Sequence, residues 1–234
     1  MSTTGDELDL VDEGKPKELH PHANMILVLR RDRTEPVRRY LAHSEVLIAA
    51  SPYFASLLGP HFGEGYALRS EQQPEITLEE DDPEAMDVLL SALHHRTTSQ
   101  YNDVDLQLLA HIAQASDKYR CNEALSPWVF RWLRESQHPG NVAEHGLLLM
   151  AAYLFEAEDE FPAISAEVVK HLPLGFSGLW SEYVILSTFP DNIKRSPKLG
   201  RQPARQHTSI REVPASLQLL WSNAPQRFET VPPL

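Results

Sequence analysis

Residues 40–58 read YLAHSEVLIAASPYFASLL, a pattern that predicts the end of a strand followed by two short helices. The residues from Tyr40 to His43 alternate between two faces, as they do in a strand leaving the core. Ser44 is a candidate N-cap for the first helix. Pro52 is predicted to start the second, because proline is tolerated in a first turn but not in a helix interior. We therefore expect this stretch to pack and to present a surface, with no catalytic residue in it.

Further motifs surround this stretch in a defined order. A histidine ends the strand, a hydrophobic helix comes next, and Ser-x-x-Phe opens the second helix, which places the motif on His43, Ser51 and Phe54. The later motifs are Phe62-Gly63-Glu64-Gly65, Ile76-Thr77-Leu78, Asp81-Asp82-Pro83, Leu93-His94 and the run Ala115–Cys121. Together they resemble the BTB (POZ) domain, and most closely its fungal type, a small domain with a short helical extension. The resemblance implies a non-enzymatic module that binds other proteins.

The wider pattern predicts a small α+β fold. Residues 24–30 and 37–43 are predicted to form a hairpin, and residues 75–79 a third strand. Asp82 and Pro83 fit the N-cap and the first residue of a helix. The prediction is a three-stranded sheet covered by a cluster of helices, which is also the fold that the BTB resemblance implies.

Composition and pattern divide the chain into four regions. Residues 1–22 are predicted to be a disordered acidic segment, residues 23–135 the BTB domain, and residues 141–187 a helical extension. Residues 188–234, rich in proline and basic residues, are predicted to be a flexible tail with one apolar island at Leu217–Trp221. Smaller expectations are a loop with a short helical turn over 59–74, an N-cap at Asp103, and helices over 142–155, 162–171 and 177–186.

The net charge of −12 is divided unevenly along the chain. Residues 193–234 carry seven Lys or Arg and two Glu, a net charge of +5, so the remainder, with 14 basic and 31 acidic residues, carries −17. An acidic body disfavours nucleic acid as a general partner, because such binding depends on neutralising phosphates. No apolar stretch approaches the roughly 20 residues of a membrane span, and the start of the chain does not look like a signal peptide. With a lone cysteine as well, we expect a protein of the cytoplasm or nucleus.

The sequence contains histidines and a cysteine, which often act in catalysis or bind metals, but they do not occur in catalytic or metal-binding arrangements. His94 and His95 are adjacent near a helix end, where a cationic histidine is favoured by the helix dipole, and adjacent residues do not form the i, i+4 pair that binds metals. His43 is predicted to be structural, with its ring hydrogen-bonded to backbone. Cys121 follows Lys118 and Arg120, yet it has no evident paired base. We therefore predict no enzyme activity, no metal and no cofactor.

One loop suggests a more specific role. In BTB adaptors of cullin-based ubiquitin ligases, a hydrophobic-x-Glu element after the Ser-x-x-Phe helix helps to dock the cullin. By resemblance, Phe62 and Glu64 occupy that position, and Tyr53 joins them as a candidate contact. An exposed aromatic residue can anchor a partner while an acid orients it. The simpler alternative is that Phe62 folds inward and that the loop is only a turn.

Two other roles remain open for comparison. A transcription or chromatin regulator could use the basic tail, but BTB regulators typically carry an acidic and a basic residue at the positions occupied here by the neutral Asn24 and Ser44. The sequence allows a homodimer without favouring one, since residues 1–20 contain little of the apolar material that many BTB dimers use.

Overall fold

The computed structural model describes residues 15–30, 36–96, 101, 104–135 and 139–188. The chain divides into two compact units, the first ending at Arg96 and the second beginning at Thr97. Across the described ranges, none of the helices has both the length and the apolar character needed to cross a membrane.

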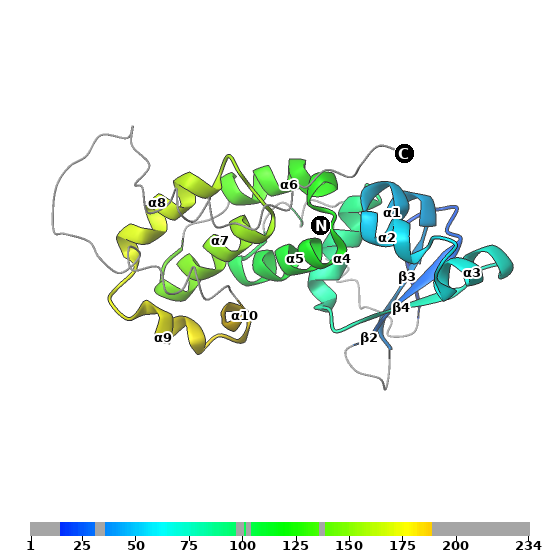
Figure 1. Cartoon of the computed structure of the whole chain (residues 1–234), viewed down its shortest axis with the longest axis horizontal. Helices are drawn as coiled ribbons and strands as arrows, with labels where there is room; N and C mark the ends of the chain where they lie inside the picture. The colour runs from blue at the N-terminus through cyan, green and yellow to red at the C-terminus, as the bar shows by residue number, and fades with distance from the viewer. Residues whose placement is uncertain (1–14, 31–35, 97–100, 102–103, 136–138, 189–234) are drawn as a thin grey trace, which may run out of the picture. The chain divides into compact units, whose positions relative to one another are not determined.

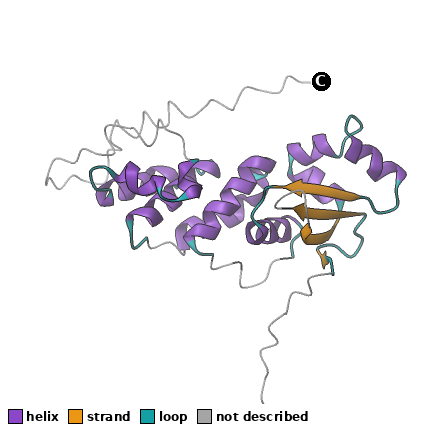
Figure 2. Ribbon diagram, turned by 90° about the horizontal axis from the view of Figure 1, so that it is seen from below, coloured by secondary structure: helices purple, strands orange, loops and turns teal. Residues whose placement is uncertain are grey.

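The sheet lies in the first unit, and Figure 2 shows its strands as neighbouring orange arrows. The strand order is β1-β3-β2-β4. β2 and β3 run antiparallel, as the predicted hairpin requires, whereas β4 is parallel to β2. β2 is the central strand of the three longer ones and is the most deeply buried of the four. The strands are β1 (Lys17–Glu18), β2 (Met25–Arg30), β3 (Pro36–Ala42) and β4 (Glu75–Glu79).

The sequence predicted three strands, but the sheet has a fourth, β1. It runs parallel to β3 and pairs Lys17 with Tyr40. The next residue, Leu19, is fully buried, and its amide donates to the carbonyl of Leu41 at 2.9 Å. The prediction of disorder over residues 1–22 is therefore wrong from Lys17 onward. Two charged residues carry no strand pattern, so this pairing could arise only from contacts with the rest of the fold.

Helices cover the sheet, and their starts follow the expected chemistry with one exception. Ser51 Oγ accepts the amide of Phe54 at 3.0 Å, and Asp82 Oδ1 accepts the amide of Ala85 at 2.9 Å. The N-cap of the first helix is His43, not Ser44, and its side chain makes no capping bond. The helices of this unit are α1 (Ser44–Ala50), α2 (Pro52–Leu57), α3 (Gly63–Ser70) and α4 (Pro83–Leu93). All of α4 is buried except Glu84 and Asp87.

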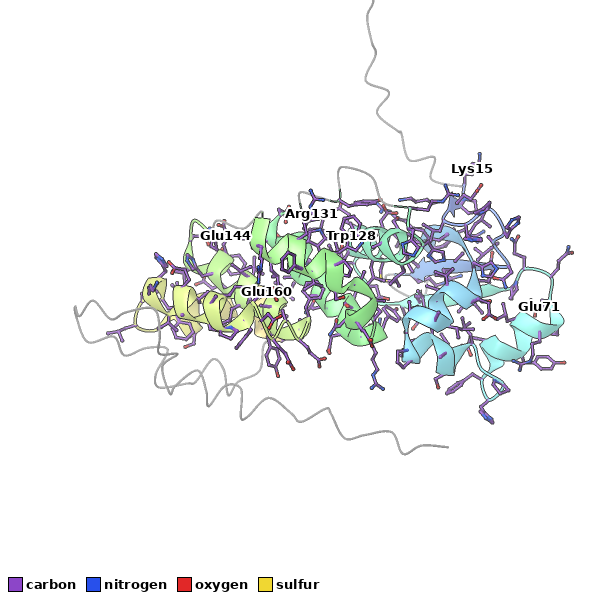
Figure 3. The ribbon with its side chains drawn as sticks, turned by 90° about the horizontal axis from the view of Figure 1, so that it is seen from above. Lys15, Glu71, Trp128, Arg131, Glu144 and Glu160 are labelled. Atoms are coloured by element: carbon purple, nitrogen blue, oxygen red, sulfur yellow. The ribbon has the colours of Figure 1, made fainter. Side chains whose placement is uncertain are left out.

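In the second unit, α7 packs between α5 and α8 (Figure 1). Asn141 caps α7, and the carboxylate of Glu144, labelled in Figure 3, returns the bond by accepting the amide of Gly140 at 2.6 Å. The N-cap of α5 is Asp105, two residues after the predicted Asp103. The helices are α5 (Leu106–Tyr119), α6 (Asn122–Glu135), α7 (Val142–Leu154), α8 (Phe161–His171), α9 (Phe176–Ser181) and α10 (Val184–Ser187).

The helix predicted over 177–186 is divided into α9 and α10 by Tyr183, whose backbone is extended. This break allows Trp180 of α9 and Leu186 of α10 both to be fully buried. The region of the predicted tail from residue 189 onward lies outside the described residues.

Candidate partner-binding surface on α2 and α3

Aromatic side chains are exposed on α2, which begins with the Ser-x-x-Phe motif, and at and after the start of α3. Tyr53 on α2 is 37% exposed, Phe62 is 48% exposed and Tyr66 on α3 is 69% exposed. Phe62 does not fold inward, so the simpler alternative for this residue is wrong. The carbonyl of Phe62 accepts the amide of Tyr66 at 3.1 Å, which places the two residues one helical turn apart. We call Tyr53, Phe62 and Tyr66 the aromatic surface.

The predicted loop over 59–74 contains a two-turn helix, α3, which ends before Glu71 (Figure 3). Its start is held by a close backbone approach. A Cβ added to Gly65 would lie 1.8 Å from the carbonyl oxygen of Gly59 and 2.6 Å from that of Leu58. The absence of a side chain at Gly65 therefore lets the first turn of α3 rest directly on the end of α2. The element Phe62-Gly63-Glu64 is consequently part of an ordered corner.

Glu64 is half-buried and lies in the first turn of α3. A carboxylate at that place stabilises the helix through its dipole. The residue therefore has a structural role already, and its remaining exposed part is what a partner could contact.

Asn24 and Ser44 occupy the positions where BTB regulators typically carry a charged pair, and the two residues form hydrogen bonds with each other. Asn24 Nδ2 donates to Ser44 Oγ at 2.9 Å, and the Ser44 amide donates to Asn24 Oδ1 at 2.9 Å. Ser44 is buried. This pair fastens the start of β2 to the start of α1 and carries no net charge.

Histidines from three segments meet beside the start of α1. His94 is buried, its Nδ1 lies 2.9 Å from the carbonyl of Leu90, and its Nε2 accepts the backbone amide of His43 at 3.3 Å. The rings of His43 and His20 lie 4.7 Å apart. Because Nε2 accepts a hydrogen bond, the His94 ring must be neutral in this arrangement. The helix dipole would favour the cationic form, but that form could not accept this bond. Burial also lowers the pKa of His94.

His43 is structural through its backbone rather than through its ring. Its Nδ1 is buried and has no hydrogen-bond partner among the described residues, so the expected ring-to-backbone bond is not made there. The acceptor is the ring of His94, and the donor is the peptide of His43. Sequence reasoning missed this because the two histidines lie 51 residues apart.

The other candidates for chemistry are packed side chains. Cys121 is fully buried, and burial raises the pKa of its thiol to about 11. Its Sγ lies 3.8 Å from the carbonyl of Ser116. Within the part of the chain that the structure describes, no three His, Cys, Asp or Glu side chains come together as a metal site would need.

Comparison with known families agrees with this geometry. Residues 24–126 match the family model of the BTB/POZ domain. This region is a BTB/POZ domain. The match begins at Asn24, just before β2, and ends within α6, so the helices α7 to α10 lie beyond it. No curated protein matches the chain.

The BTB assignment confirms the predicted α+β fold and the role of a protein–protein interaction module. BTB domains in general bind other proteins and form homodimers, and they are interaction modules rather than enzymes. The fungal type of the domain stays a prediction.

Proposed function

We propose that the chain is a substrate adaptor of a cullin-based ubiquitin ligase, acting in the cytoplasm or nucleus, and that it docks the cullin through Phe62 and Glu64 with Tyr53 beside them. The observation that supports the proposal is the 48% exposure of Phe62 at the N-cap of α3. An exposed aromatic side chain suits the role of an anchor, because a partner that buries it removes a large apolar area from water.

The geometry suits an anchor with an orienting charge. α2 has six residues and is therefore about 9 Å long, so Tyr53 at its start and Phe62 after its end fit within one interface. The ring of Tyr53 meets that of Phe54 edge-on at 5.7 Å, and Phe54 is fully buried. Aromatic residues on a fixed backbone bind with a small loss of conformational entropy.

Recruitment of corepressors is the less favoured role. It is associated with a charged pocket at positions held here by Asn24 and Ser44, and their hydrogen bonds to each other leave little capacity for a charged ligand. A regulator that acts through the basic tail depends on residues outside the described part of the chain, and no observation supports it.

A binding titration tests the proposal. The full chain is titrated with a cullin N-terminal domain, together with Phe62→Ala, Glu64→Gln and the control Val37→Ala, whose side chain is 44% exposed on β3. We expect micromolar or tighter binding, at least tenfold weaker for each of the first two variants and unchanged for the control. Absence of binding by the wild-type chain would remove the adaptor role, as would an equal loss in the control variant.

A further inference from the structure

The segment from Leu174 to Ser187, which contains α9 and α10, has large apolar residues among both its buried and its exposed positions. On the inner side Phe176, Trp180, Ile185 and Leu186 are buried. On the outer side four large apolar residues are exposed, which we call the C-terminal apolar face: Leu174 (84% exposed), Leu179 (43%), Tyr183 (47%) and Val184 (86%). All four lie within eleven consecutive residues. Large apolar side chains exposed close together are typical of a surface that a partner covers.

The outer residues cannot be buried by rolling α9 over, because its inner side is fixed by specific contacts. Trp180 Nε1 donates to the carbonyl of Val142 at 2.9 Å. The indole fills the place where a side chain at position 146 would be, since a Cβ added to Gly146 would lie 2.7 Å from Trp180 Cε2. The rings of Phe176 and Trp180 meet at 4.7 Å. The apolar face is therefore held outward by the fold.

The face also leaves room for another segment. A Cβ added to Gly178, next to Leu179, would meet no atom within 4 Å. Thr188, the last described residue, follows α10 and accepts a hydrogen bond at its Oγ1 from Gln114 Nε2 of α5 at 3.1 Å.

The sequence after α10 contains a segment that matches the face. Leu217, Leu220 and Trp221 are spaced i, i+3, i+4, which is the spacing of one side of a helix. Pro214 precedes them at a place that suits a helix start, and Pro225 follows. Residues 189–216 connect α10 to this segment, and a flexible linker of 28 residues would span roughly 30 Å. The connection is therefore long enough to return to α9 and α10.

Opposite net charges also favour binding of the C-terminal segment to this part of the chain. Residues 104–188 contain 11 acidic and 5 basic residues, a net charge of −6, whereas residues 189–234 contain 7 basic and 3 acidic residues, a net charge of +4. The segment is also covalently tethered, which gives it a high effective concentration at the face compared with a separate partner.

We propose that the C-terminal apolar face is the docking site of the chain's own segment Leu217–Trp221, which covers Leu174, Leu179, Tyr183 and Val184. The docked segment turns α9 and α10 from a surface layer into a covered one. This inference does not rest on the adaptor role, because the aromatic surface lies on other elements.

Hydrogen exchange of the full chain tests this docking. We expect the amides of residues 217–221 to exchange at least about tenfold more slowly than in the double variant Leu174→Ser/Val184→Ser, because docking protects them. Both substituted side chains are more than 80% exposed, so the inner packing stays intact, and unchanged protection of α7 amides checks this. The matched control is Tyr66→Ser, which removes a side chain that is 69% exposed on α3 and should leave the protection unchanged.

Each other outcome overturns the proposal. Fast exchange of residues 217–221 in the wild-type chain would show that the segment is not docked. Protection that persists in the double variant would show that another surface holds the segment. Protection that rises with protein concentration would assign the contact to a second copy.

Discussion

Gly65 occupies a place where no other residue fits, since the nearest atom to an added Cβ is a backbone oxygen, at 1.8 Å. We predict that Gly65→Ala destabilises the protein by about 1–3 kcal/mol, because the first turn of α3 must move away from the end of α2. Equilibrium unfolding in urea measures the change. Gly63→Ala is the matched control, because a Cβ there meets no atom within 4 Å and alanine favours a helix. Equal stability of the two variants would contradict the packing argument.

His94 predicts a pH dependence of stability with a defined sign. Burial lowers its pKa in the folded state, so below about pH 6.5 the unfolded chain takes up this proton before the folded chain does. The contribution of neutral His94 is fully present above that pH and is lost as the pH falls toward the lower, folded pKa. We expect the free energy of unfolding to decrease as the pH is lowered through this window.

His94→Gln isolates the contribution of this residue. The variant should be less stable near neutral pH by about 1–3 kcal/mol, because one buried and one partly buried hydrogen bond are disturbed. Its stability should also depend less on pH than that of the wild type. Urea unfolding across the acidic range measures both effects. The control is His95→Asn, since His95 is exposed with a positive φ of 56° that asparagine tolerates. A variant with the wild-type pH dependence would show that His94 is not the responsible group.

At the scale of elements, β1 depends on α4 for its place. Lys17 Nζ contacts Asp87 Oδ2 at 2.7 Å, and Arg38 Nη1 on β3 lies 3.8 Å from the other oxygen of the same carboxylate. Arg96 Nε adds a bond to the carbonyl of Leu19 at 3.3 Å. A two-residue strand has too few ladder bonds to form alone, so these side chains complete its attachment.

We predict that Asp87→Asn loosens β1 more than it destabilises the protein. Lys17 is 41% exposed, so the change in global stability should stay below about 1 kcal/mol. The exchange of the Leu19 amide, which bonds to Leu41, should become faster. Glu75→Gln serves as the control. It removes the ion pair that Glu75 of β4 forms with Arg39 of β3 at 3.3 Å, and it leaves β1 unchanged. No change at the Leu19 amide would show that Asp87 does not hold the strand.

At the scale of the whole molecule, charge is separated along the chain, with −17 before residue 193 and +5 after it. We predict that the full chain does not bind duplex DNA at physiological salt, since its acidic body repels phosphates and the tail supplies few cations. Fluorescence anisotropy with a labelled duplex measures this. Binding that weakens with salt and disappears on deletion of residues 193–234 would instead support the regulator role.

Local chemistry was sufficient to predict much of the fold. The hairpin, the strand over 75–79, the start of α2 at Pro52 and the start of α4 at Asp82 and Pro83 all appear as expected. Each of these depends on neighbours in the chain: a capping oxygen three residues away, a proline in a first turn, or an alternating pattern. The motif match extended this to the BTB assignment. For the candidate site, the sequence identified Phe62 and Glu64 but could not establish that Phe62 is exposed.

The features that only the tertiary structure decided depend on residues that are distant in the sequence and become neighbours in the folded chain. β1 forms because β3 and Asp87 lie beside it, and the neutral state of His94 depends on the peptide of His43. The position of α3, which begins after Phe62, depends on the close approach of Gly65 to the carbonyl oxygen of Gly59. The sequence by itself therefore determined most of the helices and strands and the family fold that they build, because those preferences are local, whereas β1 needed contacts that form only in the folded chain. The burial and charge state of single side chains followed only from packing, since burial is a property of the assembled chain.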